Sequence, residues 1–141
     1  MVKELLWKCF TENEGETDLL IKNRFNNLQS PYAVYLEGEV GAGKTYICQK
    51  VAELKGVNCL TSSSFLTFSV YYGKNKIIHA DYYYTTKPCD FFYNNIFEEI
   101  DEDTILLSEW TPEYFEMSIN QYVLNISVVN DSYRSVSFYS I

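Results

Sequence analysis

The chain has 141 residues, a formal net charge of −8 and an isoelectric point near 4.6. A hydrophobic content of 47% and a charged content of 21% are ordinary for a globular protein, and the length suits a single domain over residues 1–141. No run approaches the ~18 uncharged apolar residues of a membrane span, and the first residues lack a long apolar segment, so we expect a cytoplasmic protein without membrane contact.

The acidic balance also argues against direct binding of nucleic acid. Proteins that bind RNA or DNA usually gather Lys and Arg into a patch that replaces counterions on the phosphates. In this chain the 11 basic residues are scattered. If the protein serves an RNA, we expect it to act through a protein partner and not to contact nucleic acid itself.

The four cysteines, at positions 9, 48, 59 and 89, are too far apart for a CxxC pair. A zinc knuckle or a dithiol redox motif is therefore not supported. We expect free thiols that pack as small apolar side chains.

The N-terminal part predicts alternating strands and helices. Residues 4–10 (ELLWKCF) favour a first strand, and the polar segment 11–18 supplies residues that can cap a helix. The next helix has one apolar face, formed by Leu20, Ile21, Phe25 and Leu28. Residues 31–37 (PYAVYLE) are nearly continuously apolar, as in a buried central strand. A second helix ends near Gly56 and is apolar at Ile47, Val51 and Leu54.

The C-terminal part is richer in strands. Two strands, 64–72 and 76–84, flank a predicted turn at Gly73–Asn75. We expect residues 90–100 to be helical and residues 104–110 (TILLSEW) to form another buried strand. Residues 121–129 and 133–141 predict a final antiparallel hairpin around Asn130–Ser132. Together the pattern predicts a three-layer α/β fold of the P-loop NTPase type, with a mixed central sheet and antiparallel C-terminal strands.

The segment 34–50, VYLEGEVGAGKTYICQK, has the spacing G-x-x-x-x-G-K-[ST] of a phosphate-binding loop. Glycines at 38, 41 and 43 allow a tight turn whose N–H groups face an anion, and the following helix adds its positive end. Lys44 is expected to reach the β- and γ-phosphates of ATP, and the Thr45 hydroxyl to bind Mg²⁺. A glycine turn with an incidental lysine is the alternative, but the apolar strand before it and the amphipathic helix after it favour nucleotide binding.

Hydrolysis needs, in addition, a carboxylate near the metal and a group that orients water. Asp81 follows the apolar run KIIHA, and Glu109 follows TILLS. Ligands of open α/β sheets bind at the carboxyl ends of strands, so these acids are the candidates, although either alone is also consistent with a solvated acid at a strand end. Which of them lies nearer the metal is left open.

These motifs resemble the bacterial ATPase family of tRNA threonylcarbamoyladenosine biosynthesis (TsaE). The resemblance covers nearly the whole chain, in the family's order, at ETDLL (16–20), LEGEVGAGKTY (36–46), SSSF (62–65), HADYYY (79–84) and SEWTP (108–112). It implies an ATP- and Mg²⁺-dependent ATPase that acts on the transferase subunit and its inactive paralogue (TsaD and TsaB). In that family the ATPase resets the complex and does not make the modification itself.

The resemblance also implies roles for individual residues. Glu109, Asp81 and Lys44 match catalytic positions, and Thr45, Glu109 and Asp81 match metal positions. The segment around Glu14 to Thr17 matches one that approaches the nucleotide base. The expected nucleotide contacts are Glu14, Thr17, Gly38, Gly41, Ala42, Gly43, Lys44, Thr45 and Tyr46. Trp110 matches a tryptophan near the site, with a core role equally open, and His79 is expected to be a packed strand histidine.

Three departures from the family pattern stand out. Ser63 replaces a proline in a switch-like loop, and Tyr84 stands where the family has arginine. Tyr46 replaces a second Thr or Ser, at a position that need not touch the ligand. Tyr83 keeps the family's aromatic residue. The departures leave the phosphate and metal positions intact.

Two other functions remain open. A small-molecule or nucleotide kinase usually clamps phosphates with several arginines, whereas this chain has only Arg24 and Arg134. A nucleotide-binding regulator without turnover is favoured by the missing arginine at 84. The presence of Lys44, Thr45 and both acids argues against it.

Overall fold

The structure is a computed structural model that describes residues 2–61 and 67–141. Its elements in chain order are β1 (Glu4–Thr11), α1 (Glu14–Phe25), β2 (Tyr32–Glu37), α2 (Lys44–Leu54), β3 (Phe68–Tyr72), β4 (Lys76–Asp81), α3 (Pro88–Phe91), a π-helical turn (Phe92–Ile96), a 3₁₀ turn (Phe97–Glu99), β5 (Thr104–Glu109), β6 (Asn120–Val128) and β7 (Arg134–Ser140).

The strands form one seven-stranded sheet in the order β1-β7-β6-β2-β5-β4-β3. The four central strands β6, β2, β5 and β4 run parallel, while β1, β7 and β3 join antiparallel. The mixed sheet with antiparallel C-terminal strands, predicted from the sequence, is confirmed. Strand β2 lies at the centre, so the loop that follows it opens between two parallel neighbours, β5 and β6.

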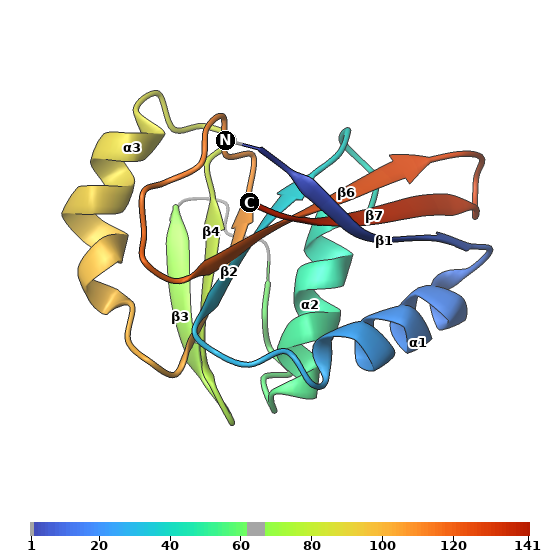
Figure 1. Ribbon diagram of the computed structural model, residues 1–141, viewed down its shortest axis with the longest axis horizontal. Helices are drawn as coiled ribbons and strands as arrows, with labels where there is room; N and C mark the ends of the chain where they lie inside the picture. Colours follow the sequence, from blue (N-terminus) through green and yellow to red (C-terminus); the bar gives the residue numbers. More distant parts are fainter. Residues whose placement is uncertain (1, 62–66) are drawn as a thin grey trace.

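Helices cover both faces of the sheet. Figure 1 shows α1 and α2 on one side and α3 on the other. Side chains of β2 alternate between these layers: Val34 and Leu36 pack with α1 and α2, whereas Ala33 and Tyr35 pack with the α3 segment. Because both faces of β2 are buried, the strand has the nearly continuous apolar sequence expected for a central parallel strand.

Local signals explain where α1 and α2 begin and end. The Asn13 side chain accepts a hydrogen bond from Glu16 N at 2.9 Å and caps α1 within the predicted polar segment. Helix α2 begins at Lys44, directly after the glycine loop, and ends at Leu54, before Gly56 in the left-handed conformation.

Three predicted boundaries were wrong or incomplete. The strand expected over 76–84 ends at Asp81, because the Asp81 carboxylate accepts a hydrogen bond from Tyr83 N and the chain turns at 82–85. The strand expected over 64–72 begins at Phe68, and its residues 64–66 lie outside the described part. The helix expected over 90–100 spans residues 88–99 and changes along its length from α to π to 3₁₀ geometry.

None of the helices in residues 2–61 and 67–141 is both long and apolar enough to cross a membrane.

Candidate active site

The glycine loop joins the end of β2 to the start of α2, at the carboxyl end of the parallel strands. Gly41 and Gly43 have φ angles of 82° and 114°, which favour glycine. At Gly38 a Cβ atom would lie 2.5 Å from the backbone oxygen of Ile126, so the loop passes too close to β6 for a side chain. Among the described residues no side chain caps α2, and its first N–H groups remain available to an anion.

Lys44 is folded back onto this loop. Its Nζ donates hydrogen bonds to the backbone oxygens of Gly38 (2.6 Å) and Glu39 (2.9 Å). The same atom lies 4.1 Å from the centre of the Trp110 ring, a cation–π contact. Burial lowers the pKa of the Lys44 ammonium, while Glu109 and Asp81 oppose that shift. The positive charge is therefore partly withdrawn from water, in a place where phosphate oxygens would be strong partners.

Glu109 lies at the end of β5 and faces the first residues of α2. The Thr45 hydroxyl donates to Glu109 Oε1 at 2.9 Å and lies 3.2 Å from Oε2. The carboxylate is only 2% exposed, which would be costly for a charge without hydrogen-bond donors. The structure therefore brings together two residues that the sequence predicted as metal ligands and that lie 64 positions apart.

Asp81 ends β4 and pairs in register with Glu109 across the β4–β5 ladder. Its side chain is half-buried, and Oδ1 accepts a hydrogen bond from Tyr83 N at 3.0 Å. Both acids thus end neighbouring parallel strands as predicted. The Thr45 hydroxyl donates to Glu109, and no hydrogen bond joins Thr45 to Asp81 among the described residues.

These residues line a cleft of about 640 Å³, a size typical of small-molecule sites. Its walls include the loop residues Gly41, Gly43, Lys44 and Thr45, both acids, and the aromatic residues Tyr46, Tyr83, Tyr84 and Trp110. Trp110 has a φ angle of 60°, which is rare for a bulky residue and turns its ring toward the loop after β5 ends. Tyr84, at the family's arginine position, is 87% exposed at the rim.

A second cleft of about 440 Å³ lies on the other side of the same loop. It shares Gly41, Gly43 and Tyr46 with the first cleft and adds Ala42, Asn13, Glu14, Thr17, Ile126, Asp131, Ser132 and Arg134. Glu14 and Thr17 therefore lie beside the loop as predicted. The Thr17 hydroxyl is engaged within the protein, because it donates to Thr11 Oγ1 at 2.9 Å.

Sequence reasoning missed the contribution of the β6–β7 turn to this cleft. Arg134 Nε donates to the Ala42 backbone oxygen at 3.1 Å and so supports the loop from outside. The one available signal was that Arg134 is among the chain's few arginines. Its place beside residue 42 follows only from the pairing of β6 with β2.

Tyr46 lies between the two clefts and bridges the helices. Its hydroxyl donates to the carboxylate of Asp18 in α1. Burial, followed by this hydrogen bond, raises the pKa of the Tyr46 phenol, which stays protonated and acts as a donor. The replacement of a small residue by Tyr46 therefore fixes α1 against α2 next to the loop.

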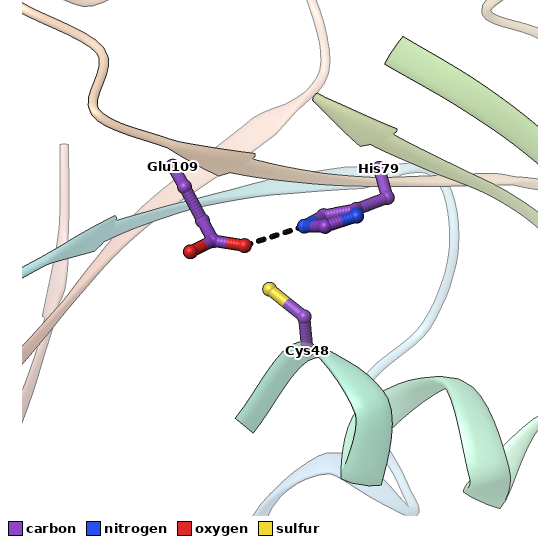
Figure 2. A group of neighbouring side chains, drawn as sticks. All are labelled: Cys48, His79 and Glu109. Atoms are coloured by element: carbon purple, nitrogen blue, oxygen red, sulfur yellow. Dashed lines mark hydrogen bonds and ion pairs between the residues drawn. The ribbon is translucent and has the colours of Figure 1, made fainter. Parts of the chain in front are cut away.

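Two buried side chains, Cys48 and His79, meet the Glu109 carboxylate from behind. Figure 2 shows Cys48 of α2 and His79 of β4 directed at the Glu109 carboxylate. His79 Nε2 lies 2.5 Å from Glu109 Oε2. Burial, followed by the charge of Glu109, raises the pKa of the Cys48 thiol well above its ordinary value, so the thiol is protonated near neutral pH. His79 is a packed strand residue, as expected, but its partner is the candidate catalytic acid.

The expectation for the cysteines is confirmed only in part. All four are free thiols. Cys48 is fully buried in the core, whereas Cys59 is exposed and Cys9 and Cys89 are half-buried. The predicted packing as small apolar side chains therefore applies to Cys48. Ser63, expected in a switch-like loop, lies outside the described residues.

The residues around the first cleft fit a magnesium nucleotide. A loop with glycines at positions 38, 41 and 43, an uncapped helix start and a lysine suit phosphate groups. The oxygen atoms of Thr45, Glu109 and Asp81 are hard ligands of the kind that Mg²⁺ prefers. The arrangement can therefore bind phosphates, hold a metal beside them and direct a carboxylate at the same point.

Comparison with known proteins places the chain in a family. The model of the family "Threonylcarbamoyl adenosine biosynthesis protein TsaE" matches residues 11–136. A relative from Aquifex aeolicus, named tRNA threonylcarbamoyladenosine biosynthesis protein TsaE, is 29% identical over 96% of this chain and 98% of its own length. A protein of the same name from Rickettsia felis is 33% identical over 70% of this chain, and the match spans 59% of that relative.

A solved structure supports the fold. "Crystal structure of Bacillus subtilus YdiB" superposes with a TM-score of 0.69 and 23% identity, over 100% of this chain and 88% of that chain. The superposition agrees with the three-layer, P-loop NTPase-like architecture. Taken with the match to residues 11–136, these findings show that the chain belongs to the TsaE family of threonylcarbamoyl adenosine biosynthesis proteins.

Proposed function

We propose that this TsaE-family protein is a Mg²⁺-dependent ATPase that supports threonylcarbamoyladenosine modification of tRNA. The family match assigns the chain to that biosynthetic system. The observation that carries the ATPase proposal is the hydrogen bond between Thr45 and the buried Glu109 carboxylate, directly beside a phosphate-binding loop. The loop alone is sufficient to bind phosphate, so phosphate binding does not require a carboxylate at this place. Hydrolysis does require one near the metal.

In the proposed reaction each residue has a distinct task. The loop N–H groups and the start of α2 bind the phosphates, and Lys44 leaves the Gly38 and Glu39 oxygens to pair with them. Bound Mg²⁺ would neutralise the negative charge that develops on the phosphate oxygens. Thr45 and Glu109 would hold the metal, and Glu109 would also orient the attacking water. The second cleft, beside Glu14 and Tyr46, would receive the nucleotide base.

The proposed partners are the transferase subunit and its inactive paralogue, TsaD and TsaB. The net charge of −8 supports docking on proteins in preference to bare RNA. We expect slow ATP hydrolysis by the isolated chain, faster hydrolysis when the transferase complex is added, and weak binding of bare tRNA. Tight tRNA binding by the chain alone at physiological salt would contradict this assignment.

A kinase is the second candidate, and the first cleft offers little support for it. Of the two arginines in the chain, Arg134 donates to the loop backbone from the second cleft and Arg24 stacks on Trp7. Neither lines the first cleft. A regulator without turnover is the third candidate, and it predicts ATP binding without phosphate release. A turnover assay with water alone and with candidate phosphoacceptors separates the three.

Thermal unfolding with and without Mg-ATP tests the binding step. A ligand at a hundred times its dissociation constant stabilises the folded state by ~2.7 kcal/mol, and we expect a shift of that size for the parent. Lys44→Ala is expected to erase most of the shift. Lys22→Ala, which removes an exposed lysine of α1, is the charge-matched control and is expected to keep it. An unchanged melting curve of the parent at saturating Mg-ATP would rule out the site.

A further inference from the structure

His79 lies behind Glu109, on the side of the carboxylate away from the phosphate loop. Alternation along the strands places His79 of β4 and Glu109 of β5 on the sheet face that α2 covers. In the β4–β5 ladder His79 pairs with Leu107, so the Glu109 side chain starts one side-chain pair further along the same face. Both side chains are buried, with 1% and 3% exposure, and Figure 2 shows them pointing toward each other.

The two carboxylate oxygens of Glu109 differ in their nearest partners, and the Thr45 hydroxyl also lies 3.2 Å from Oε2. Oε2 lies 2.5 Å from His79 Nε2, on the side away from the cleft. Oε1 accepts the 2.9 Å hydrogen bond from the Thr45 hydroxyl, on the side of the phosphate loop. A glutamate side chain with one oxygen held from behind has few remaining orientations. The bond to His79 therefore holds the carboxylate in the orientation in which Oε1 is the oxygen nearer to the Thr45 hydroxyl.

A metal held by Cys48, His79 and Glu109 is the competing explanation of this cluster. The three ligand atoms lie within 4.8 Å of one another. Two tetrahedral zinc ligands, each about 2.0–2.2 Å from the ion, lie roughly 3.4 Å apart. The 2.5 Å between His79 Nε2 and Glu109 Oε2 is too short for that arrangement and is a direct contact, shorter than an ordinary N–H···O hydrogen bond. The geometry thus favours a direct bond between the two side chains.

We propose that His79 is a positioning residue that donates its Nε2–H to Glu109 Oε2 and so holds the carboxylate in the orientation that presents Oε1 as the oxygen nearer to Thr45. This inference rests on the proposed function, because it assigns His79 a task through Glu109 in hydrolysis. His79 does not itself reach the first cleft, whose walls it does not line. Its role is to hold the acid, in the way that buried partners orient metal ligands and catalytic groups in other sites.

Two variants separate positioning from packing. His79→Gln keeps an N–H donor near the position of Nε2, whereas His79→Leu fills the space without a donor. Loss of such a supporting partner typically lowers activity about 10- to 100-fold, and we expect His79→Leu to lose at least tenfold in single-turnover hydrolysis with little change in ATP affinity. His79→Gln is expected to recover most of the rate. Ile78→Val, on the opposite face of β4, is the control for a general core change.

A double variant tests whether His79 acts through Glu109. In a Glu109→Gln background, His79→Leu is expected to add little further loss, because residues that act as one unit are not additive. An equal additional loss in that background would overturn the inference. If both variants fold and hydrolyse ATP at the same reduced rate, the inference is also overturned. A packing role of His79 alone would then explain the loss.

The imidazole signals provide a readout that does not depend on ATP hydrolysis. The chain has one histidine, so nitrogen-15 spectra of untagged protein report His79 alone. We expect the Nε2-protonated tautomer, with a proton protected from solvent, and a change of the Nε2 signal in Glu109→Gln. An Nδ1-protonated ring, or an Nε2 signal that Glu109→Gln leaves unchanged, would overturn the inference. If the parent hydrolyses no ATP, the proposed function fails, and these spectra still decide whether His79 holds Glu109.

Discussion

The ends of β4 and β5 carry the same type of side chain in very different surroundings. Asp81 and Glu109 pair across the ladder, yet Glu109 is 2% exposed and Asp81 is half-buried. Glu109 is bound by Thr45 from the loop side and by His79 from behind, while Asp81 accepts a backbone N–H from Tyr83. The position of the strand explains the difference: β5 lies between two parallel strands, β2 and β4, under α2.

Both carboxylates lie at strand ends, so position alone does not distinguish them. The burial of Glu109 and the hydrogen-bond donors around it make it the better candidate for catalysis. Glu109 is held by groups from two elements, so its direction toward Thr45 is set before a ligand binds. Asp81 is closer to solvent and is fixed by its own turn. Glu109 is therefore the acid bonded to the Thr45 hydroxyl. Asp81 has a supporting place in the wall of the cleft.

The largest expected effect is that of Glu109→Ala. We expect turnover to fall at least a hundredfold, a barrier increase of ~2.7 kcal/mol, because the group that faces Thr45 is removed. ATP affinity is expected to stay within about tenfold, ~1.4 kcal/mol, since the phosphates bind mainly to the loop. Single-turnover hydrolysis and an ATP titration measure the two quantities. A Glu109→Ala variant that hydrolyses ATP like the parent would reduce Glu109 to a buried strand-end acid.

A smaller effect is expected for Asp81→Ala. Because Asp81 lines the cleft without contacting Thr45, we expect a rate loss of about tenfold, ~1.4 kcal/mol, together with a higher Mg²⁺ requirement. A Mg²⁺ titration of hydrolysis by the parent and by both acid variants measures this. A loss at Asp81 that exceeds the loss at Glu109 would reverse the comparison between the two strand ends.

The smallest expected effect concerns the thiol beside Glu109. In the folded state burial raises the pKa of Cys48 well above its ordinary value of 9.0. The folded chain therefore keeps a proton that the unfolded chain releases, and this part of the stability is present below pH 9 and is lost as the pH rises toward the folded-state pKa. The free energy of unfolding is expected to fall by at most about 1.4 kcal/mol per pH unit from this one group.

Denaturant unfolding between pH 8 and 10 checks this prediction. Cys48→Ala is expected to show a shallower loss of unfolding free energy than the parent above pH 9. Cys59→Ala, which removes an exposed thiol, is expected to follow the parent. The same slope in the parent and in Cys48→Ala would mean that the thiol beside Glu109 does not resist ionisation.

The parts of the fold and site that the sequence predicted are those with local signals. The glycine loop, the two helix starts and the apolar runs of β2 and β5 each depend on residues that are neighbours in the chain. The end of β4 was missed because the turn after Asp81 is set by its own side chain, against the strand preference of three tyrosines. The helix at 88–99 was predicted, but its change from α to π to 3₁₀ geometry was not, and its buried residues Phe92 and Ile96 pack against the sheet.

The site was predicted as a set of residues but not as a network. Both acids were found from strand ends, while the bond between His79 and Glu109 depends on the β4–β5 register and on side-chain direction. Arg134 was missed for the same reason, because its contact with the loop spans 92 positions. Such contacts have no signal within a single stretch of sequence.

A structure of the protein with Mg²⁺ and a non-hydrolysable ATP analogue would decide whether Glu109 and the glycine loop form one site. We expect the phosphates in the Gly38–Thr45 loop, with Lys44 released from the Gly38 and Glu39 oxygens. We expect the metal at the Thr45 hydroxyl, within direct or water-mediated reach of Glu109 and with Asp81 as the more distant acid. A nucleotide bound away from the loop, or a metal held by Asp81 with Glu109 still closed onto Thr45, would contradict this arrangement.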